Sequence, residues 1–177
     1  RSNLGDKQGA IADYNEALRV NPNFFLAYNN RGVVRYVLGD KQRAIADFNQ
    51  ALKINPNFAN AYIGRGNARD DLGDKQGAIA DFNQALKINP NSVDAYGSRA
   101  AVRLKLGDKQ GAIADCNQAL KIDPNNAGVY ALRGGARYGL GDKQGTIQDF
   151  QKAADLFQQQ GDRESYQKVL NSLRKLQ

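Results

Sequence analysis

Residues 72–91 read LGDKQGAIADFNQALKINPN, and close copies of this stretch recur along the chain. The copies lie 34 residues apart and begin at Leu4, Leu38, Leu72, Leu106 and Leu140. A fixed period of this length is typical of a solenoid, in which one supersecondary unit stacks repeatedly on its neighbours. The chain is therefore expected to form one elongated domain of repeats.

Each repeat is expected to contain two helices. In residues 7–20 one helix face collects the apolar residues Ala10, Ile11, Tyr14, Ala17 and Leu18. Each such helix ends at a proline, which cannot continue it. Phe25–Leu38 is read as the other kind of helix, with Gly39 just past its end. Asp40 is expected to cap the following helix, and Asn57 to cap the one after that.

The array is predicted to be all-α, with about ten helices. The 34-residue period predicts a proline at position 158, but that residue is glutamine. A last amphipathic helix then starts early, after Gly161. Residues 1–4 are read as the tail of a helix whose beginning is missing. Because the sequence starts at Arg1 and not at Met, the chain is interpreted as a fragment or a processed product. The predicted segments are a half repeat at 1–24, full repeats at 25–58, 59–92, 93–126 and 127–160, and a capping helix at 161–177.

Composition argues against several classes of function. Histidine is absent, and Cys116 is the single cysteine, so neither a zinc site nor an internal disulfide is expected. Cys116 is interpreted as a small buried hydrophobe that leaves space where other repeats have an aromatic ring. No apolar run approaches the ~18 residues of a membrane span. We expect no cofactor and a cytoplasmic location.

The residues Tyr62, Gly66, Leu72, Gly73, Ala78, Phe82, Ala85 and Pro90 stand in an order that resembles the tetratricopeptide repeat (TPR). The resemblance covers about residues 1–158 and looks like the arrays of bacteria. Three positions depart from the pattern, namely Ala100, Cys116 and Thr146. The resemblance implies a right-handed superhelical solenoid of antiparallel helix pairs, without catalytic activity. Its first helices would line a concave groove that holds a peptide or protein.

Carrying the family's groove positions onto this chain predicts a partner-binding surface that varies from repeat to repeat. Its residues are Asn29, Asn30, Val33, Tyr36, Ile63, Asn67, Asp70, Asp71, Asp94, Ser98, Leu104, Lys105, Leu132 and Tyr138. A basic segment over Asp70 and Asp71, and an apolar one over Leu104, Leu132 and Tyr138, would suit it. No carboxylate clamp for a chaperone tail is expected, because Ile63, Gly97 and Ser98 occupy clamp positions.

Arginines also recur in phase, and two readings of them stay open. Two series of arginines and one series of aspartates each repeat every 34 residues. The first arginine series is Arg31, Arg65, Arg99 and Arg133, and the second is Arg1, Arg35, Arg69, Arg103 and Arg137. The aspartates are Asp13, Asp47, Asp81, Asp115 and Asp149. The preferred reading is a ladder of intramolecular ion pairs with arginine stems packed on aromatic rings. The other is a basic track for phosphate. The loop at residues 73–77 lacks the order of a phosphate loop and is read as a capped turn.

The function predicted from the sequence is a noncatalytic protein-interaction scaffold. An alternative is self-association through the half repeat, whose apolar stripe around Ile11 and Tyr14 would be exposed. A third is nucleic-acid binding, suggested by the net charge of +7. Because the ladder is expected to engage most of the arginines, no nucleic-acid partner is predicted.

Overall fold

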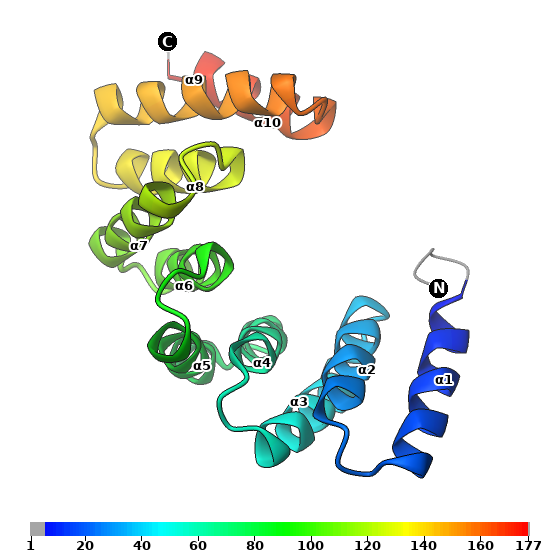
Figure 1. Cartoon of the computed structure of the whole chain (residues 1–177). Coiled ribbons are helices and arrows are strands. Elements are labelled where there is room, and N and C mark those ends of the chain that lie inside the picture. The colour runs from blue at the N-terminus through cyan, green and yellow to red at the C-terminus, as the bar shows by residue number, and fades with distance from the viewer. Residues whose placement is uncertain (1–5, 177) are drawn as a thin grey trace. The chain divides into compact units, whose positions relative to one another are not determined.

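The computed structural model describes residues 6–176, and over that range it contains ten α-helices and no β-strand (Figure 1). The helices are α1 (Lys7–Val20), α2 (Phe25–Val37), α3 (Lys41–Ile54), α4 (Ala59–Asp71), α5 (Lys75–Ile88), α6 (Val93–Lys105), α7 (Lys109–Ile122), α8 (Ala127–Tyr138), α9 (Lys143–Gln159) and α10 (Arg163–Arg174). The all-α array of helix pairs predicted from the sequence is confirmed. The predicted helix tail at residues 1–4, and with it Arg1, lies outside the described residues.

The turn within each helix pair is made by a repeated Gly-Asp. In the turn between α4 and α5, Gly73 has a φ of +90°, which glycine adopts without a steric penalty. The next amide, of Asp74, then donates to the carbonyl of Arg69 at 2.9 Å, which closes the end of α4. The Asp74 carboxylate accepts from the amide of Gly77 at 2.9 Å and caps α5. Asp40 caps α3 in the same way, as predicted.

The connection between repeats differs from the prediction. The amide of Asn57 donates to the side chain of Asn55 at 3.1 Å, and α4 begins after Phe58 without a side-chain cap. The predicted cap at Asn57 is therefore wrong, because Asn55 forms a local turn with its own backbone instead. Later repeats do have a cap one residue further on, where Ser92 and Asn126 accept from backbone amides.

The helices are grouped into two compact units, Arg1–Pro90 with α1–α5 and Asn91–Gln177 with α6–α10. In the first unit α2 packs on α3, α4 on α5, and α3 on α4, around a core that includes Phe48. Phe48 is fully buried, and burial of such a ring contributes roughly 1.5–3 kcal/mol. In the second unit α6 packs on α7, α8 on α9, and α10 covers α9 with Val169, Leu170 and Leu173.

Candidate functional site

The arginines that recur in the sequence form ion pairs inside each repeat. In the first full repeat Arg31 and Arg35, on α2, both reach Asp47 on α3, at 2.7 Å each. The guanidinium of Arg31 also lies 5.4 Å from the ring centroid of Tyr28 and donates to Asn15 of the preceding repeat at 2.6 Å. The ion pair therefore joins the two helices of a repeat, and the bond to Asn15 joins that repeat to α1.

The same ion pairs recur in the other three full repeats. Their carboxylates are Asp81, Asp115 and Asp149, each almost fully buried and each bound to two arginines. In these repeats the second arginine also approaches the capping aspartate, as Arg69 does Asp74 at 3.7 Å. In each of these repeats the negative charges of two aspartates thus balance the positive charges of two arginines. This favours the interpretation that the arginines form structural ion pairs over the interpretation that they bind phosphate.

Cys116 is the single cysteine of the chain, and it is buried. Burial raises the pKa of the Cys116 thiol to about 12, so the thiol is neutral at physiological pH. Over residues 6–176, no cluster of three or more histidine, cysteine or acidic residues could hold a metal ion. In the same part of the chain, no helix has the length and apolar character needed to cross a bilayer.

The predicted binding residues all lie on the first helix of a repeat, but they differ in how far they are exposed. Asn30, Val33, Asp71, Asp94, Lys105 and Tyr138 are exposed. Tyr36, Ile63, Asn67, Asp70, Ser98, Leu104 and Leu132 are half-buried, and Asn29 is buried. Four of them belong to α2, four to α4, four to α6 and two to α8. The two units are therefore described separately.

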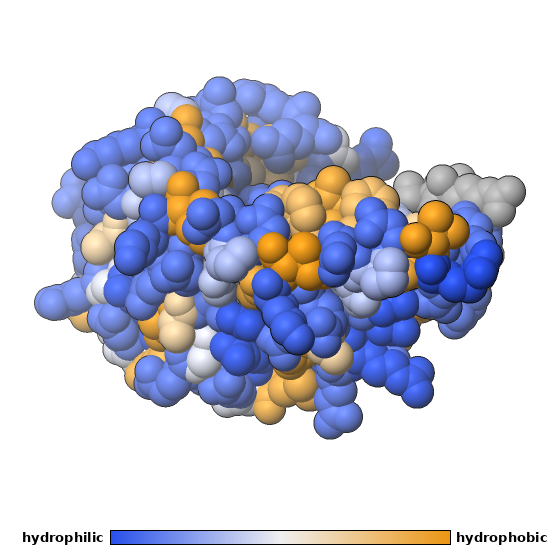
Figure 2. Space-filling model, turned by 60° about the horizontal axis from the view of Figure 1, so that its bottom comes forward, coloured by the Kyte–Doolittle hydropathy of each residue, from blue (hydrophilic) through white to orange (hydrophobic). Residues whose placement is uncertain are grey.

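In the first unit, α2 presents an apolar stripe. Leu26, Val33 and Val37 lie seven and four residues apart, which places them on one face of the helix. All three are exposed, Val33 to 44% and Val37 to 54%. The face of the molecule in Figure 2 has its apolar residues in small patches among hydrophilic ones. An exposed stripe of this kind is a feature of surfaces that bind another chain.

Asn29 lies on α2 between these positions and is only 7% exposed. Its side-chain nitrogen donates to Asn30 at 3.0 Å, while its Oδ1 atom is buried and has no hydrogen-bond partner within residues 6–176. A buried acceptor without a donor is costly, and such groups in folded proteins call for a physical explanation. A donor supplied by a bound molecule would satisfy this atom.

The structure also brings two predicted residues of the first unit together. The hydroxyl of Tyr36 on α2 donates to the carboxylate of Asp71 on α4 at 3.1 Å, and Lys41 lies 3.0 Å from the same oxygen. Burial, together with this carboxylate, raises the pKa of the Tyr36 hydroxyl. Sequence reasoning did not include Lys41 in the site. Its recurrence in phase, as at Lys75 and Lys109, was the available signal.

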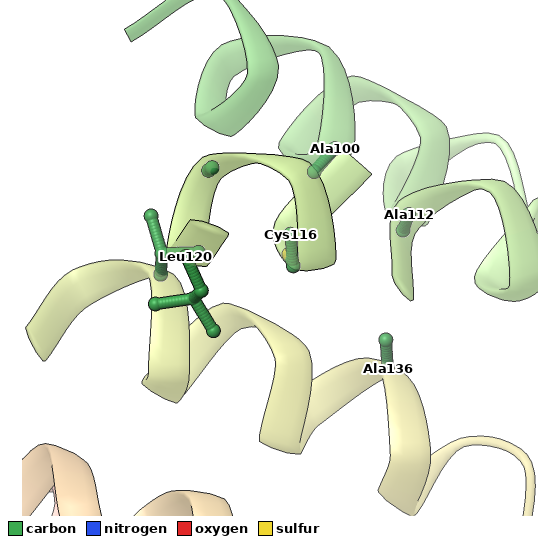
Figure 3. Packing of buried hydrophobic residues seen from close by; sticks show 7 residues of the cluster. Ala100, Ala112, Cys116, Leu120 and Ala136 are labelled. Atoms are coloured by element: carbon green, nitrogen blue, oxygen red, sulfur yellow. The ribbon is translucent and has the colours of Figure 1, made fainter. Parts of the chain in front are cut away.

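In the second unit, the surface is less apolar than its sequence indicates. Leu104 and Leu132 are half-buried because they pack against the core cluster that includes Ala100, Cys116 and Leu120. Figure 3 shows these three residues of the cluster. Tyr138, at the end of α8, is 63% exposed. It forms a wall of a shallow pocket completed by Phe150, Ser172, Lys175 and Leu176, which sequence reasoning missed. These residues are far apart in the sequence, and α10 brings them to α8 only in the fold.

The sequence and the fold can be compared with known proteins. Three models of the tetratricopeptide repeat match residues 3–39, 25–58 and 63–127. No curated protein matches the sequence significantly. The crystal structure of MamA is similar with a TM-score of 0.80 and 26% identity, over 89% of this chain and 92% of that chain.

Two further solved structures share the fold at lower identity. YrrB, a TPR protein with an unusual peptide-binding site, has a TM-score of 0.70 and 19% identity, over 93% of this chain and 92% of that chain. The first TPR of Spaghetti (RPAP3), bound to the HSP90 peptide SRMEEVD, has a TM-score of 0.65 and 23% identity, over 66% of this chain and 93% of that chain. With its helix pairs, its 34-residue period and these matches across residues 3–127, the chain belongs to the tetratricopeptide repeat family.

Proposed function

We propose that this chain is a noncatalytic protein-interaction scaffold, which binds a peptide or protein segment on the faces of its first helices. The TPR fold is in general a binding module without catalytic residues of its own. The observation that carries the proposal is the exposed stripe on α2, where Leu26, Val33 and Val37 face solvent although the core nearby is complete.

A comparison of equivalent residues in the four full repeats also supports binding on the exposed faces of the first helices. The positions that hold the helices together are nearly identical from repeat to repeat, as in Tyr28, Tyr62, Tyr96 and Tyr130 under their arginines. In contrast, the positions of Val33 and Val37 hold Asn67 and Asp71 one repeat later. Residues that packing leaves unconstrained differ in each repeat, which gives each first helix its own recognition chemistry.

The ligand that suits α2 has apolar side chains and an extended or helical backbone. A backbone or side-chain N–H of this ligand would donate to the buried Oδ1 of Asn29. Asp71 already shares its charge with Lys41, so Asp70 and Asp71 attract a basic segment less strongly than the sequence alone indicates. Tyr138 in the second unit offers one further apolar contact. We propose no carboxylate clamp, since Ile63, Gly97 and Ser98 lack the cationic and amide groups that it needs.

The proposal is tested by selecting ligands from a displayed random-peptide library on the immobilised protein and measuring their affinities by isothermal titration. We expect Val33→Asp to weaken binding of the selected peptides by about ten-fold, the effect of losing one well-buried apolar contact. Val20→Asp is the matched control, because Val20 is equally apolar, 73% exposed and on α1. Equal loss with both variants, or no loss with Val33→Asp, would contradict the proposed surface.

Asn29→Leu separates binding from folding. It removes the buried acceptor, so the free energy of unfolding should stay the same or increase. If the acceptor serves a ligand, the same variant weakens the selected peptides. Unchanged peptide affinity would assign Asn29 to the fold alone.

A further inference from the structure

In the first unit, the same three positions carry one kind of side chain on α2 and another kind on α4. On α2 they form the apolar stripe of Leu26, Val33 and Val37. One repeat later, on α4, they form a polar stripe of Asn60, Asn67 and Asp71. Packing positions of the two helices are nearly unchanged, as in Tyr28 and Tyr62. The two stripes therefore differ in chemistry while the helices that carry them pack alike.

Both stripes are open to solvent although each helix packs on second helices at both sides. Helix α2 packs on α1 and α3, and α4 packs on α3 and α5. Asn60 and Asp71 are nevertheless exposed and Asn67 is half-buried, while the three residues of the apolar stripe are all exposed. The open surface is thus a feature of first helices within the array, because it recurs on α4 with a helix pair before it and its own partner after it.

Contacts at both ends hold the two stripes side by side. At the start of the helices, the rings of Phe25 and Phe58 meet edge to face, with their centroids 5.1 Å apart. At the other end, the hydroxyl of Tyr36 on α2 donates to the carboxylate of Asp71 on α4 at 3.1 Å. Phe25 and Tyr36 each directly precede a residue of the apolar stripe. A segment bound along these helices therefore meets apolar side chains on one side and polar ones on the other.

Asn60 and Asn67 have the chemistry to bind peptide groups. Each side-chain amide carries both donors and an acceptor, and neither amide has a hydrogen-bond partner within residues 6–176. Asp71, in contrast, already accepts from Tyr36 and pairs with Lys41. An extended chain leaves its N–H and C=O groups free and points alternate side chains to opposite sides. A helix bonds these groups internally, so its backbone could not engage the two asparagines.

We propose that the first unit binds an extended segment of another protein in which every second residue is aliphatic. This inference rests on the proposed function and specifies its ligand. The aliphatic side chains contact the apolar stripe of α2, which has no charged member. On the other side, Asn67 accepts from one N–H of the segment and donates to one C=O, and Asn60 does the same two helical turns away.

The test compares two displayed libraries of short peptides on the immobilised whole chain. One library has aliphatic residues at alternate positions, and the other has them at helical spacing and is held helical by a staple, because short helices are mostly unfolded in water. We expect binders from the alternating library, weakened by Val33→Asp. Methylating single backbone nitrogens of such a binder removes one N–H at a time. The affinity should fall by about ten-fold where that N–H bonds an asparagine.

Asn67→Ala in the protein should weaken the unmethylated binder by about ten-fold, and methylation of the N–H that Asn67 accepts should then cause no further loss. Gln50→Ala is the matched control, because Gln50 is an exposed amide of the same unit on the second helix α3. It should leave the affinity unchanged. Alanine favours the helix at both positions, so both variants should keep the circular dichroism of the wild type.

The possible outcomes separate this inference from the proposed function. Binders that come only from the helical library and are weakened by Val33→Asp would overturn the extended segment and leave the proposed function in place. Equal effects of Asn67→Ala and Gln50→Ala would also overturn it. If neither library yields a ligand whose affinity depends on Val33, the proposed function fails together with this inference.

Discussion

The size of one residue on each first helix is coupled to the size of one residue on the second. A Cβ atom at Gly66 would lie 2.7 Å from the ring of Phe82, and one at Gly134 would lie 2.7 Å from the ring of Phe150. Phe48 is restricted from two sides, because Gly32 and Gly64 both face its ring. An aromatic ring at this position therefore requires glycine opposite.

The third full repeat satisfies the same constraint with different residues. Ala100 replaces the glycine and Cys116 replaces the ring, and both are fully buried in one cluster (Figure 3). The sequence presented them as two unrelated departures, one of which would leave a cavity. The two residues are sixteen positions apart in the sequence and belong to one core cluster, Ala100 from α6 and Cys116 from α7. A local sequence pattern does not reveal that they compensate each other.

We expect Cys116→Phe alone to lower the free energy of unfolding by about 1–3 kcal/mol, because the ring meets the Cβ of Ala100. Adding Ala100→Gly should recover most of that loss, although Ala100→Gly alone is destabilising by about 1 kcal/mol or more. Urea unfolding of the wild type, both single variants and the double variant measures the coupling. Additive effects of the two substitutions would show that these residues do not compensate each other.

Helix ends were largely predictable, because they depend on local chemistry. Gly73 and Asp74 specify the turn between α4 and α5 through one backbone conformation and one cap. The burial of a helix was not predictable in the same way. α1 and α5 have almost the same residues, and only their neighbours make Asp81 buried and Asp13 exposed.

The contrast between buried Asp81 and exposed Asp13 gives a test of how much the Arg–Asp ion pairs stabilise the fold. Asp13 occupies the same position of the repeat and serves as the control. Asp81→Asn leaves Arg65 and Arg69 without their shared carboxylate, and we expect a loss of about 3 kcal/mol, the lower end for breaking a buried ion pair. Asp13→Asn should change the free energy of unfolding by less than about 0.5 kcal/mol. Thermal and urea unfolding compare the two. Similar losses would mean that the ion pair contributes little and that the aspartate acts through its helix alone.

At the scale of the whole chain, the 34-residue period predicted the repeated helix pairs and their order, and the break in that period before Gly161 predicted the last helix. The period could not predict the division into units at Pro90, nor which groove positions are used by the core. Leu104 and Leu132 read as open apolar residues in the sequence, but their long side chains reach the cluster around Cys116. Asn29 read as an exposed amide and is buried, because side-chain burial depends on packing across helices.

Charge is the last property that belongs to the whole chain. A net charge of +7 favours attraction to phosphate. However, the ladder arginines are bound to carboxylates such as Asp81 and Asp149, and their stems lie against tyrosine rings. To contact phosphate, they would have to leave the ion pairs that join the two helices of each repeat.

We therefore expect binding to single-stranded and duplex DNA weaker than micromolar at about 150 mM salt, measured by fluorescence anisotropy across a salt series. Weak residual attraction at low salt would come from exposed lysines such as Lys53, Lys87 and Lys121 on the second helices. Lys53→Gln, Lys87→Gln and Lys121→Gln together should remove it without loss of stability. Micromolar affinity that falls steeply between about 50 and 200 mM salt, and that survives the triple variant, would show that the arginines are available to phosphate after all.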